Sequence, residues 1–349
     1  MKNIVLTGGG TAGHIMPNIA LLPYLNKEYN VFYIGTNGME KELVKKTTNI
    51  PFYEITSAKL ERRLSLKNLL IPFKLLKGIF QARKILKSIK PACVFSKGGF
   101  VAVPVVIASK MLKIPVVSHE SDYSLGLANK ICLKFSSCLC TSFKQTALST
   151  SKGVYTGSPI RQSLFKGSLD KAEKECGFKN KKPVILVFGG SLGAKAINNS
   201  LREALPNIIK KYNIIHITGK GNIDEKISKD SVYQIEFTNH IEDFFAYANI
   251  VVCRSGSNAI FELLALKKPM LLIPLSKASS RGDQIENAED FKKHNYAHVL
   301  PQENLTSKTL VEKIEELFKN KDSLILSMQN ASKTSGCENI LKEIKKWSK

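Results

Sequence analysis

The sequence predicts an α/β protein with two doubly wound domains, each built on a parallel sheet. Short apolar runs alternate with helical segments along the chain, which is typical of parallel sheets. The chain has 349 residues, 43% of them apolar, which suits two cores of roughly 150 to 180 residues each. Each half also opens with an apolar run that ends in glycines, at 3–10 and at 184–190. This echo indicates two similar domains that bind ligands at the carboxyl ends of their strands.

The expected elements follow from the apolar runs. The strands expected in the first half are 3–7, 31–34, 93–96, 116–119, 138–141 and 154–156. Those expected in the second half are 184–188, 214–218, 234–237, 250–253, 270–273 and 298–300. The polar segment 157–170 is the expected linker. The predicted domains are therefore residues 1–163 and 164–334, and a last helix is expected at about 338–348.

The charge is unevenly distributed along the chain. The net charge is +23, and residues 1–165 hold 23 Lys and Arg against 7 Asp and Glu. Ten basic residues fall within 59–90: Lys59, Arg62, Arg63, Lys67, Lys74, Lys77, Arg83, Lys84, Lys87 and Lys90. Large apolar residues are interleaved with the lysines, which favours a helix resting on an anionic membrane surface. No recognised nucleic-acid-binding motif accompanies the charge, so we expect no nucleic-acid partner.

Targeting signals and metal sites are not expected. No apolar run approaches the ~18 to 20 residues of a membrane span, and the first run ends early in glycines, so we expect a cytoplasmic chain. The seven cysteines contain no Cys-x-x-Cys pair. We expect Cys138 and Cys140 to point to opposite faces of a strand and to share no metal. No His, Cys or carboxylate cluster has metal-ligand spacing, so we expect no protein-bound metal.

The first glycine motif carries a histidine. Gly8, Gly10 and Gly13 have the spacing of a dinucleotide fingerprint, but that fingerprint expects an acidic residue about 20 positions later, after the second strand. The expected second strand ends at Tyr-Ile-Gly-Thr (33–36), without an acid. A phosphate-binding P-loop would need a lysine where His14 stands. The remaining interpretation is a turn that approaches a ligand and is followed by a histidine suited to general-base chemistry.

Three glycine- or serine-rich turns follow strands of the second half. The turn at 189–194 offers backbone N–H groups and the Ser191 hydroxyl to a diphosphate. The turn at 254–262 opens a helix, and Glu262 is placed to accept hydrogen bonds from ribose hydroxyls. The polar loop at 280–288 is a candidate reader of sugar hydroxyls.

Together these motifs resemble the MurG family, bacterial transferases of glycosyltransferase family 28. The motifs in chain order are Gly-Gly-Thr-Ala-Gly-His (9–14), Ser-Lys-Gly-Gly-Phe-Val (96–101), His-Glu (119–120), Gly-Ser-Pro-Ile-Arg (157–161), Gly-Gly-Ser-Leu-Gly-Ala (189–194) and Arg-Ser-Gly (254–256) with the helix up to 262. The resemblance covers nearly the whole chain. It depends on all six motifs occurring together in this order, because no single motif is specific.

The resemblance implies a GT-B architecture, in which two Rossmann-like domains face each other across a cleft. The first domain would receive lipid I, undecaprenyl-diphospho-muramoylpentapeptide, as a peripheral protein on the cytoplasmic face of the cell membrane. The second would bind UDP-N-acetylglucosamine. The implied reaction is an inverting transfer of N-acetylglucosamine to the muramoyl 4-hydroxyl, giving lipid II for peptidoglycan synthesis without metal or cofactor. The segment 335–349 would pack back on the first domain.

Matching the motifs assigns roles to individual residues. His14, as candidate base, and Glu262, as ribose ligand, are the two residues expected to act most directly in the reaction. The other residues implied to touch the donor are Thr11, Ala12, Gly13, Arg161, Ser191, Ile241, Ser257, Asn258, Ala259, Ile260, Phe261 and Gln284. Asp122 stands where the family often has asparagine, and its carboxylate cannot donate a hydrogen bond as an amide does.

Rival functions remain open. Another glycosyltransferase of this architecture, acting on a diacylglycerol acceptor, would use the same donor turns, and a UDP-sugar epimerase would share the fold. A non-catalytic basic module that binds anionic membrane or nucleic acid would not need His14 or Glu262.

Overall fold

The computed structural model describes residues 1–58, 71–190, 193–228, 230–331 and 336–349. Ser191 therefore lies outside the described residues, as do the basic residues Lys59, Arg62, Arg63 and Lys67. The chain divides into two compact units. The first holds Met1–Arg161 and Thr334–Lys349, and the second holds Gln162–Lys333.

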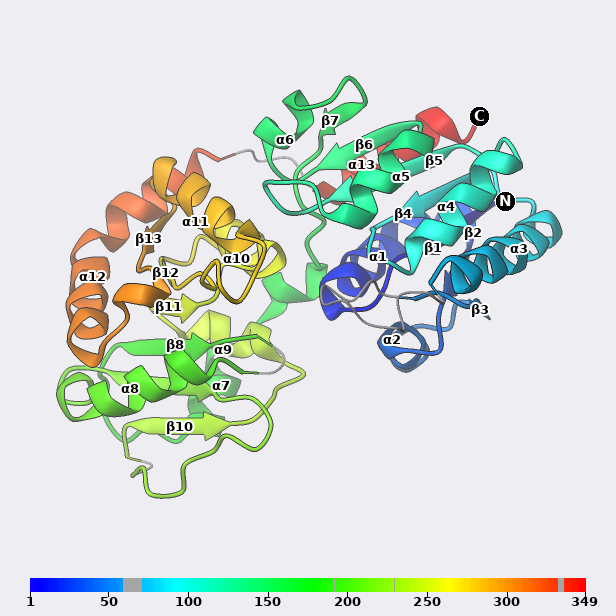
Figure 1. Cartoon of the computed structure of the whole chain (residues 1–349). Helices are drawn as coiled ribbons and strands as arrows, with labels where there is room; N and C mark the ends of the chain where they lie inside the picture. The colour runs from blue at the N-terminus through cyan, green and yellow to red at the C-terminus, as the bar shows by residue number, and fades with distance from the viewer. Residues whose placement is uncertain (59–70, 191–192, 229, 332–335) are drawn as a thin grey trace. The chain divides into compact units, whose positions relative to one another are not determined.

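The first unit is a seven-stranded parallel sheet in the order β3-β2-β1-β4-β5-β6-β7 (Figure 1). Its strands are β1 (Lys2–Thr7), β2 (Tyr29–Gly35), β3 (Phe52–Glu54), β4 (Cys93–Ser96), β5 (Val116–Glu120), β6 (Cys138–Thr141) and β7 (Gly153–Tyr155). Its helices are α1 (Ala12–Leu25), α2 (Met39–Thr47), α3 (Ile71–Ile89), α4 (Ala102–Met111), α5 (Leu127–Phe135), α6 (Lys144–Leu148) and α13 (Gly336–Trp347). The strand order reverses between β1 and β4, which is where doubly wound sheets bind ligands.

The second unit is a six-stranded parallel sheet in the order β10-β9-β8-β11-β12-β13. Its strands are β8 (Val184–Phe188), β9 (Asn213–Ile217), β10 (Val232–Ile235), β11 (Ile250–Cys253), β12 (Met270–Leu272) and β13 (Ala297–Val299). Its helices are η2 (Gln162–Lys166), α7 (Leu169–Cys176), α8 (Lys195–Ile208), α9 (Ile241–Tyr247), α10 (Ser257–Ala265), α11 (Asp283–Lys293), η3 (Gln302–Asn304) and α12 (Ser307–Gln329). Here the order reverses between β8 and β11.

The prediction of two doubly wound parallel-sheet domains is confirmed, and each of the twelve expected strands overlaps a strand of the structure. The short edge strand β3 was missed. It has three residues, pairs only with β2, and leaves its side chains partly or fully exposed, so it has no apolar run to reveal it.

The expectation for Cys138 and Cys140 is wrong. Residues two apart on a strand share one face, and both side chains lie in the apolar core beside Cys93 and Cys337. Burial raises the pKa of the Cys93 thiol to about 12, so this thiol stays protonated at neutral pH. The cluster is a packed part of the core.

The last helix belongs to the first unit. α13, drawn in red in Figure 1, packs against α1, β4 and β5 although it ends the chain. Ile340 and Ile344 are buried in the same core cluster as Leu21 and Leu25 of α1. The helix end is also fastened by hydrogen bonds, from Lys2 Nζ to the Ser348 carbonyl (2.9 Å) and between the Tyr29 and Ser348 hydroxyls (2.8 Å).

Candidate active site

The first glycine turn joins β1 to α1 at the point where the strand order of the first unit reverses. Thr11 is the N-cap of α1, so Ala12, Gly13 and His14 form its first turn. The Thr11 hydroxyl lies 2.9 Å from His14 Nδ1, and the His14 backbone N–H donates to the Thr11 carbonyl (3.0 Å). Both contacts orient the imidazole, so a hydrogen-bonded histidine stands at the carboxyl edge of the sheet.

A second glycine turn, which follows β4, packs against the first. Gly99 has a φ of +77°, and a Cβ atom there would lie 3.2 Å from His14 Nδ1. A Cβ at Gly8 would similarly meet the Lys97 Cβ at 3.0 Å. Glycine is therefore required where the two turns touch, because any larger side chain would displace the histidine or the neighbouring strand.

Lys97 belongs to the Ser-Lys-Gly-Gly motif, and the sequence pattern assigns it no role. It follows β4, is only 2% exposed, and burial lowers the pKa of its ammonium, an effect opposed by the charges of Glu120 and Asp122. A buried cation of this kind is costly in a protein interior, which marks the carboxyl end of β4 as a polar region.

Several buried polar atoms at the carboxyl edge of this sheet have no hydrogen-bond partner within the described residues. They include His119 Nδ1 and the hydroxyls of Ser121 and Ser142. His119 Nε2 lies 3.3 Å from the Gly157 carbonyl, so Nε2 carries the proton and Nδ1 accepts. Burial and the nearby Lys97 hold the pKa of His119 well below its usual value, so the ring is neutral. Such unpaired groups are suited to bind water or a polar ligand.

Glu120 organises the loop that contains Asp122. One Glu120 oxygen accepts the N–H groups of Ser121 (2.9 Å) and Asp122 (3.1 Å). The other accepts the Gly126 N–H (2.9 Å) and the Asn129 side-chain amide (3.0 Å). Four donors satisfy this carboxylate, so Glu120 shapes the loop while Asp122 stays half-buried at its start.

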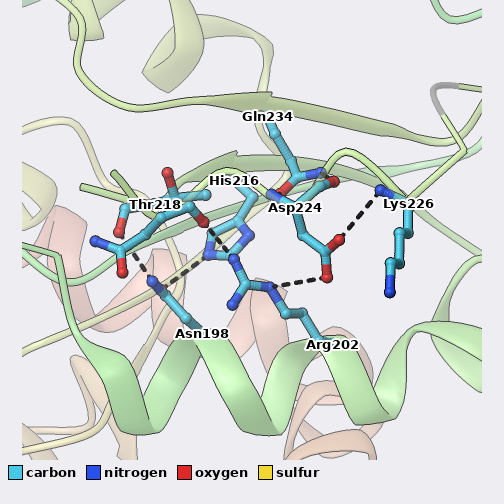
Figure 2. Close-up of polar contacts among 8 residues, drawn as sticks. Asn198, Arg202, His216, Thr218, Asp224, Lys226 and Gln234 are labelled. Atoms are coloured by element: carbon cyan, nitrogen blue, oxygen red, sulfur yellow. Dashed lines mark hydrogen bonds and ion pairs between the residues drawn. The ribbon is translucent and has the colours of Figure 1, made fainter. Parts of the chain in front are cut away.

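The corresponding turn of the second unit follows β8. Residues 189, 190 and 193 are glycines, and the Gly193 N–H donates to the Gly190 carbonyl (3.0 Å). Figure 2 shows how α8 supports the neighbouring loop after β9. Asn198 donates to the Thr218 carbonyl (2.8 Å) and accepts from His216 Nε2 (3.0 Å). One helical turn later, Arg202 binds the Asn222 carbonyl and lies 3.8 Å from the Asp224 carboxylate.

The turn after β11 leads directly into α10. Gly256 is the N-cap of α10, and no acidic residue occupies the first turn of this helix. A Cβ atom on Gly256 would meet no other atom within 4 Å. Its open helix N-terminus is suited to an anion, and Glu262 lies farther along the same helix, half-buried. Ile260 is fully buried, so only its backbone can contact a ligand.

Arg254 and Ser255 fasten this turn to the loop after β12. Arg254 donates to the Ile273 carbonyl (2.9 Å) and to the Gln302 side chain (2.6 Å). Ser255 donates to the Gln284 carbonyl (2.7 Å), and the Gln284 side-chain oxygen accepts the Leu275 N–H (3.1 Å). Gln284 is thus held next to the α10 turn with its amide nitrogen as the group that can donate to a ligand.

The site residues proposed from the sequence fall into two groups. The first unit holds Thr11, Ala12, Gly13, His14, Asp122 and Arg161. Arg161 is the last residue of the N-terminal segment of this unit. Ile241, Ser257, Asn258, Ala259, Ile260, Phe261, Glu262 and Gln284 belong to the second. Ile241 opens the short helix α9. Within the described ranges, no group of three or more His, Cys, Asp or Glu could hold a metal ion.

Comparison with known proteins places both halves in one family. Residues 4–140 match the N-terminal domain of glycosyltransferase family 28, and residues 184–344 match its C-terminal domain. A Clostridium tetani (strain Massachusetts / E88) protein is 51% identical over 352 residues, covering 99% of this chain and 98% of its own length. A Clostridium botulinum (strain 657 / Type Ba4) protein is 49% identical over 355 residues, with both chains fully covered. Both are named UDP-N-acetylglucosamine–N-acetylmuramyl-(pentapeptide) pyrophosphoryl-undecaprenol N-acetylglucosamine transferases.

A solved structure agrees with these relatives. The crystal structure of Acinetobacter baumannii MurG is 25% identical, covers 99% of this chain and all of its own, and superposes with a TM-score of 0.78. The match confirms the expected GT-B architecture. The chain therefore belongs to glycosyltransferase family 28, and within it to the family of N-acetylglucosamine transferases represented by these clostridial relatives.

Proposed function

We propose that the chain transfers N-acetylglucosamine from UDP-N-acetylglucosamine to the muramoyl 4-hydroxyl of lipid I, with inversion at the anomeric carbon, and so forms lipid II. The observation that carries this proposal is the full-length similarity to relatives whose names state this donor and acceptor. The strand-end turns of both units support it, because each presents groups that such a transfer needs.

The second unit would hold the donor. The open N-terminus of α10 supplies backbone N–H groups to the diphosphate, which lowers the free energy of the departing UDP. Glu262 would accept hydrogen bonds from the ribose, and Gln284 would donate its amide N–H to the sugar. Arg161, Ser191 and Ile241 complete the proposed donor contacts. In this proposal protein groups alone stabilise the leaving group, and no metal or cofactor takes part.

The first unit would supply the base. In the neutral tautomer whose Nδ1–H donates to the Thr11 hydroxyl, Nε2 of His14 would carry the lone pair. That lone pair would take the proton of the muramoyl 4-hydroxyl as its oxygen attacks the anomeric carbon. Ala12 and Gly13 would lie beside the donor sugar, and Asp122 would accept a hydrogen bond from the acceptor or donor.

We also propose that α3 rests on the anionic cytoplasmic surface of the cell membrane. Phe73, Leu76 and Phe80 lie on one face of the helix at 70%, 53% and 62% exposure. Lys74 and Lys77 flank them and are exposed. In the described part of the chain, no helix combines the length and apolar character needed to cross a bilayer. Surface binding through one helix would bring the enzyme to a lipid-anchored acceptor without spanning the membrane.

The decisive assay offers purified protein labelled UDP-N-acetylglucosamine together with lipid I in detergent micelles. We expect label to move to the lipid, and the β configuration of the product to establish inversion. Diacylglycerol replaces lipid I in a parallel reaction. Transfer to diacylglycerol alone would replace the proposed acceptor, and release of free UDP with a changed sugar but no transfer would indicate an epimerase.

A further inference from the structure

A carboxylate from the protein itself occupies the first glycine turn. Glu40, in the first turn of α2, is only 1% exposed. One of its oxygens accepts the Gly10 backbone N–H (3.2 Å), and the other accepts the Thr36 backbone N–H (2.9 Å) and the Thr36 hydroxyl. Glu40 thus connects the turn after β1 with the end of β2.

The glycines around this carboxylate leave room for it. A Cβ on Gly9 would lie 2.7 Å from Glu40 Cδ, and a Cβ on Gly35 would lie 2.9 Å from Glu40 Cγ. Real Cβ contacts are not this short, so alanine at either position would displace the carboxylate. Glycine is therefore required at Gly9 and Gly35 because an internal side chain fills the adjoining space.

In a dinucleotide-binding fold, the glycine turn after the first strand receives the pyrophosphate of the ligand. Here the Gly10 N–H already donates to Glu40, and the buried negative charge would repel a phosphate. The acid that the fingerprint expects after the second strand is present in a different form: Glu40 lies four residues beyond Thr36 and points back into the turn.

We propose that Glu40 is a positioning residue for the transfer reaction: its carboxylate takes the place of a ligand phosphate and holds the first glycine turn in the shape that orients His14. The connection is short. Glu40 fixes the Gly10 N–H, the next residue is Thr11, and the Thr11 hydroxyl contacts His14 Nδ1 at 2.9 Å. This inference rests on the proposed function only in naming His14 as the base.

The test is chemical rescue of a Glu40→Ala variant by formate. Removing the side chain leaves a carboxylate-sized space with three unpaired donors, which a small carboxylate ion can fill. We expect turnover to fall by roughly 10- to 100-fold, because a small displacement of a catalytic group has effects of this size. The dissociation constant for UDP should not change. Added formate should restore turnover in a saturable way, and chloride at equal ionic strength should not.

Glu42→Ala is the matched control, since Glu42 is exposed on the same helix turn. It should keep wild-type turnover and show no response to formate. Full turnover in Glu40→Ala would overturn the proposal. So would a cooperatively folded Glu40→Ala protein whose lost turnover formate does not restore.

A second measurement requires no acceptor and so separates this inference from the proposed function. Formate should raise the thermal unfolding temperature of Glu40→Ala with a saturable dose dependence, because an ion that binds only the folded state stabilises it. Wild type and Glu42→Ala should respond only to ionic strength. If Glu40→Ala does not fold, the same measurements apply to Glu40→Gln. The glutamine amide can replace only part of the Glu40 contacts, because its nitrogen faces the Gly10 N–H and cannot accept from it. Equal turnover of Glu40→Gln and wild type would contradict the proposal.

Discussion

Two histidines, one in each unit, show how burial decides what an imidazole can do. His14 is half-buried on the first turn of α1, and the contact with the Thr11 hydroxyl orients its ring. His216 lies inside β9 and donates to the Asn198 side chain. Burial, with a smaller effect of the Arg202 charge, lowers the pKa of His216 to about 4. The first ring is suited to proton transfer, whereas the second supports a loop.

Replacing His14 by alanine should separate catalysis from donor binding. We expect His14→Ala to lower kcat by roughly 100-fold or more, because a general base contributes 10²–10⁴-fold to such a reaction. UDP affinity, measured by calorimetry, should stay within about twofold, since the proposed UDP contacts made by α10 lie in the other unit. Equal losses of turnover and UDP affinity would show that His14 has a structural role.

The buried His216 should make the second unit sensitive to acid. The pKa of about 4 in the folded state lies below the usual histidine value of 6.5, so the unfolded chain takes up a proton first as the pH falls. The contribution of His216 to the free energy of unfolding is therefore complete above about pH 6.5. It is lost as the pH falls from 6.5 to 4, and the loss is up to about 3 kcal/mol.

Urea unfolding at pH 7.5 and 5.0 would measure this loss. His216→Leu should unfold more easily at pH 7.5 but lose less stability on acidification than wild type. His294→Gln, at an exposed histidine, should keep the wild-type pH dependence. An unchanged pH dependence in His216→Leu would exclude His216 as the cause.

At the scale of elements, α3 has two distinct faces. Ile79, Ala82 and Leu86 are buried against the sheet of the first unit. The opposite face exposes Phe73 and Phe80 among lysines. Large exposed aromatic side chains at helical spacing are unusual on a soluble surface and often mark an interaction site. The buried face explains why the helix packs on the first unit, and the exposed face is the one that we propose contacts the bilayer.

Charge reversal on this face should weaken membrane binding. Lys74→Glu with Lys77→Glu removes two attractive charges and adds two repulsive ones, so we expect at least about tenfold weaker binding to vesicles with anionic lipids at low salt. High salt should narrow the difference, because it screens the attraction. Vesicle sedimentation would measure the binding. Lys210→Glu with Lys319→Glu, at exposed positions of the second unit, is the control. Equal binding of both double variants and wild type would reject the role of α3.

At the scale of the whole molecule, the chain builds its first unit from both of its ends. α13 returns to the first unit after the second is complete, and its apolar residues pack in the core with α1. The first unit therefore cannot be completed until the last residues are present, while the second is made from one continuous segment.

Truncating a buried side chain of α13 should destabilise the first unit selectively. Ile340 is fully buried, so Ile340→Ala should lower the free energy of unfolding of that unit by about 2–5 kcal/mol. Thermal unfolding with and without UDP would assign the transitions, since UDP should shift the transition of the second unit. Ile340→Ala should move the other transition, and the exposed Lys342→Ala should move neither. Equal shifts of both transitions would show that the units unfold together.

The fold class followed from the sequence because parallel strands buried on both faces are continuous apolar runs that end in glycine turns. The runs before 8–10 and 189–190 marked the central strands of both sheets, and the Ser-Gly turn before α10 marked an anion-binding helix start. The shared face of Cys138 and Cys140 also follows from the two-residue period of a strand, which contradicts the expectation of opposite faces.

Contacts between distant segments were decided only by the tertiary structure. The sequence pattern assigns no partner to Glu40, whose carboxylate lies inside the first glycine turn. It likewise does not reveal that Lys97 is buried, with the charges of Glu120 and Asp122 acting on its ammonium. The reason is physical: periodicity reports which face of an element is apolar, whereas the partner of a polar side chain depends on which other elements the sheet brings to the same edge. The dinucleotide pattern was thus visible in the sequence, and only the structure showed that the protein supplies the anion itself.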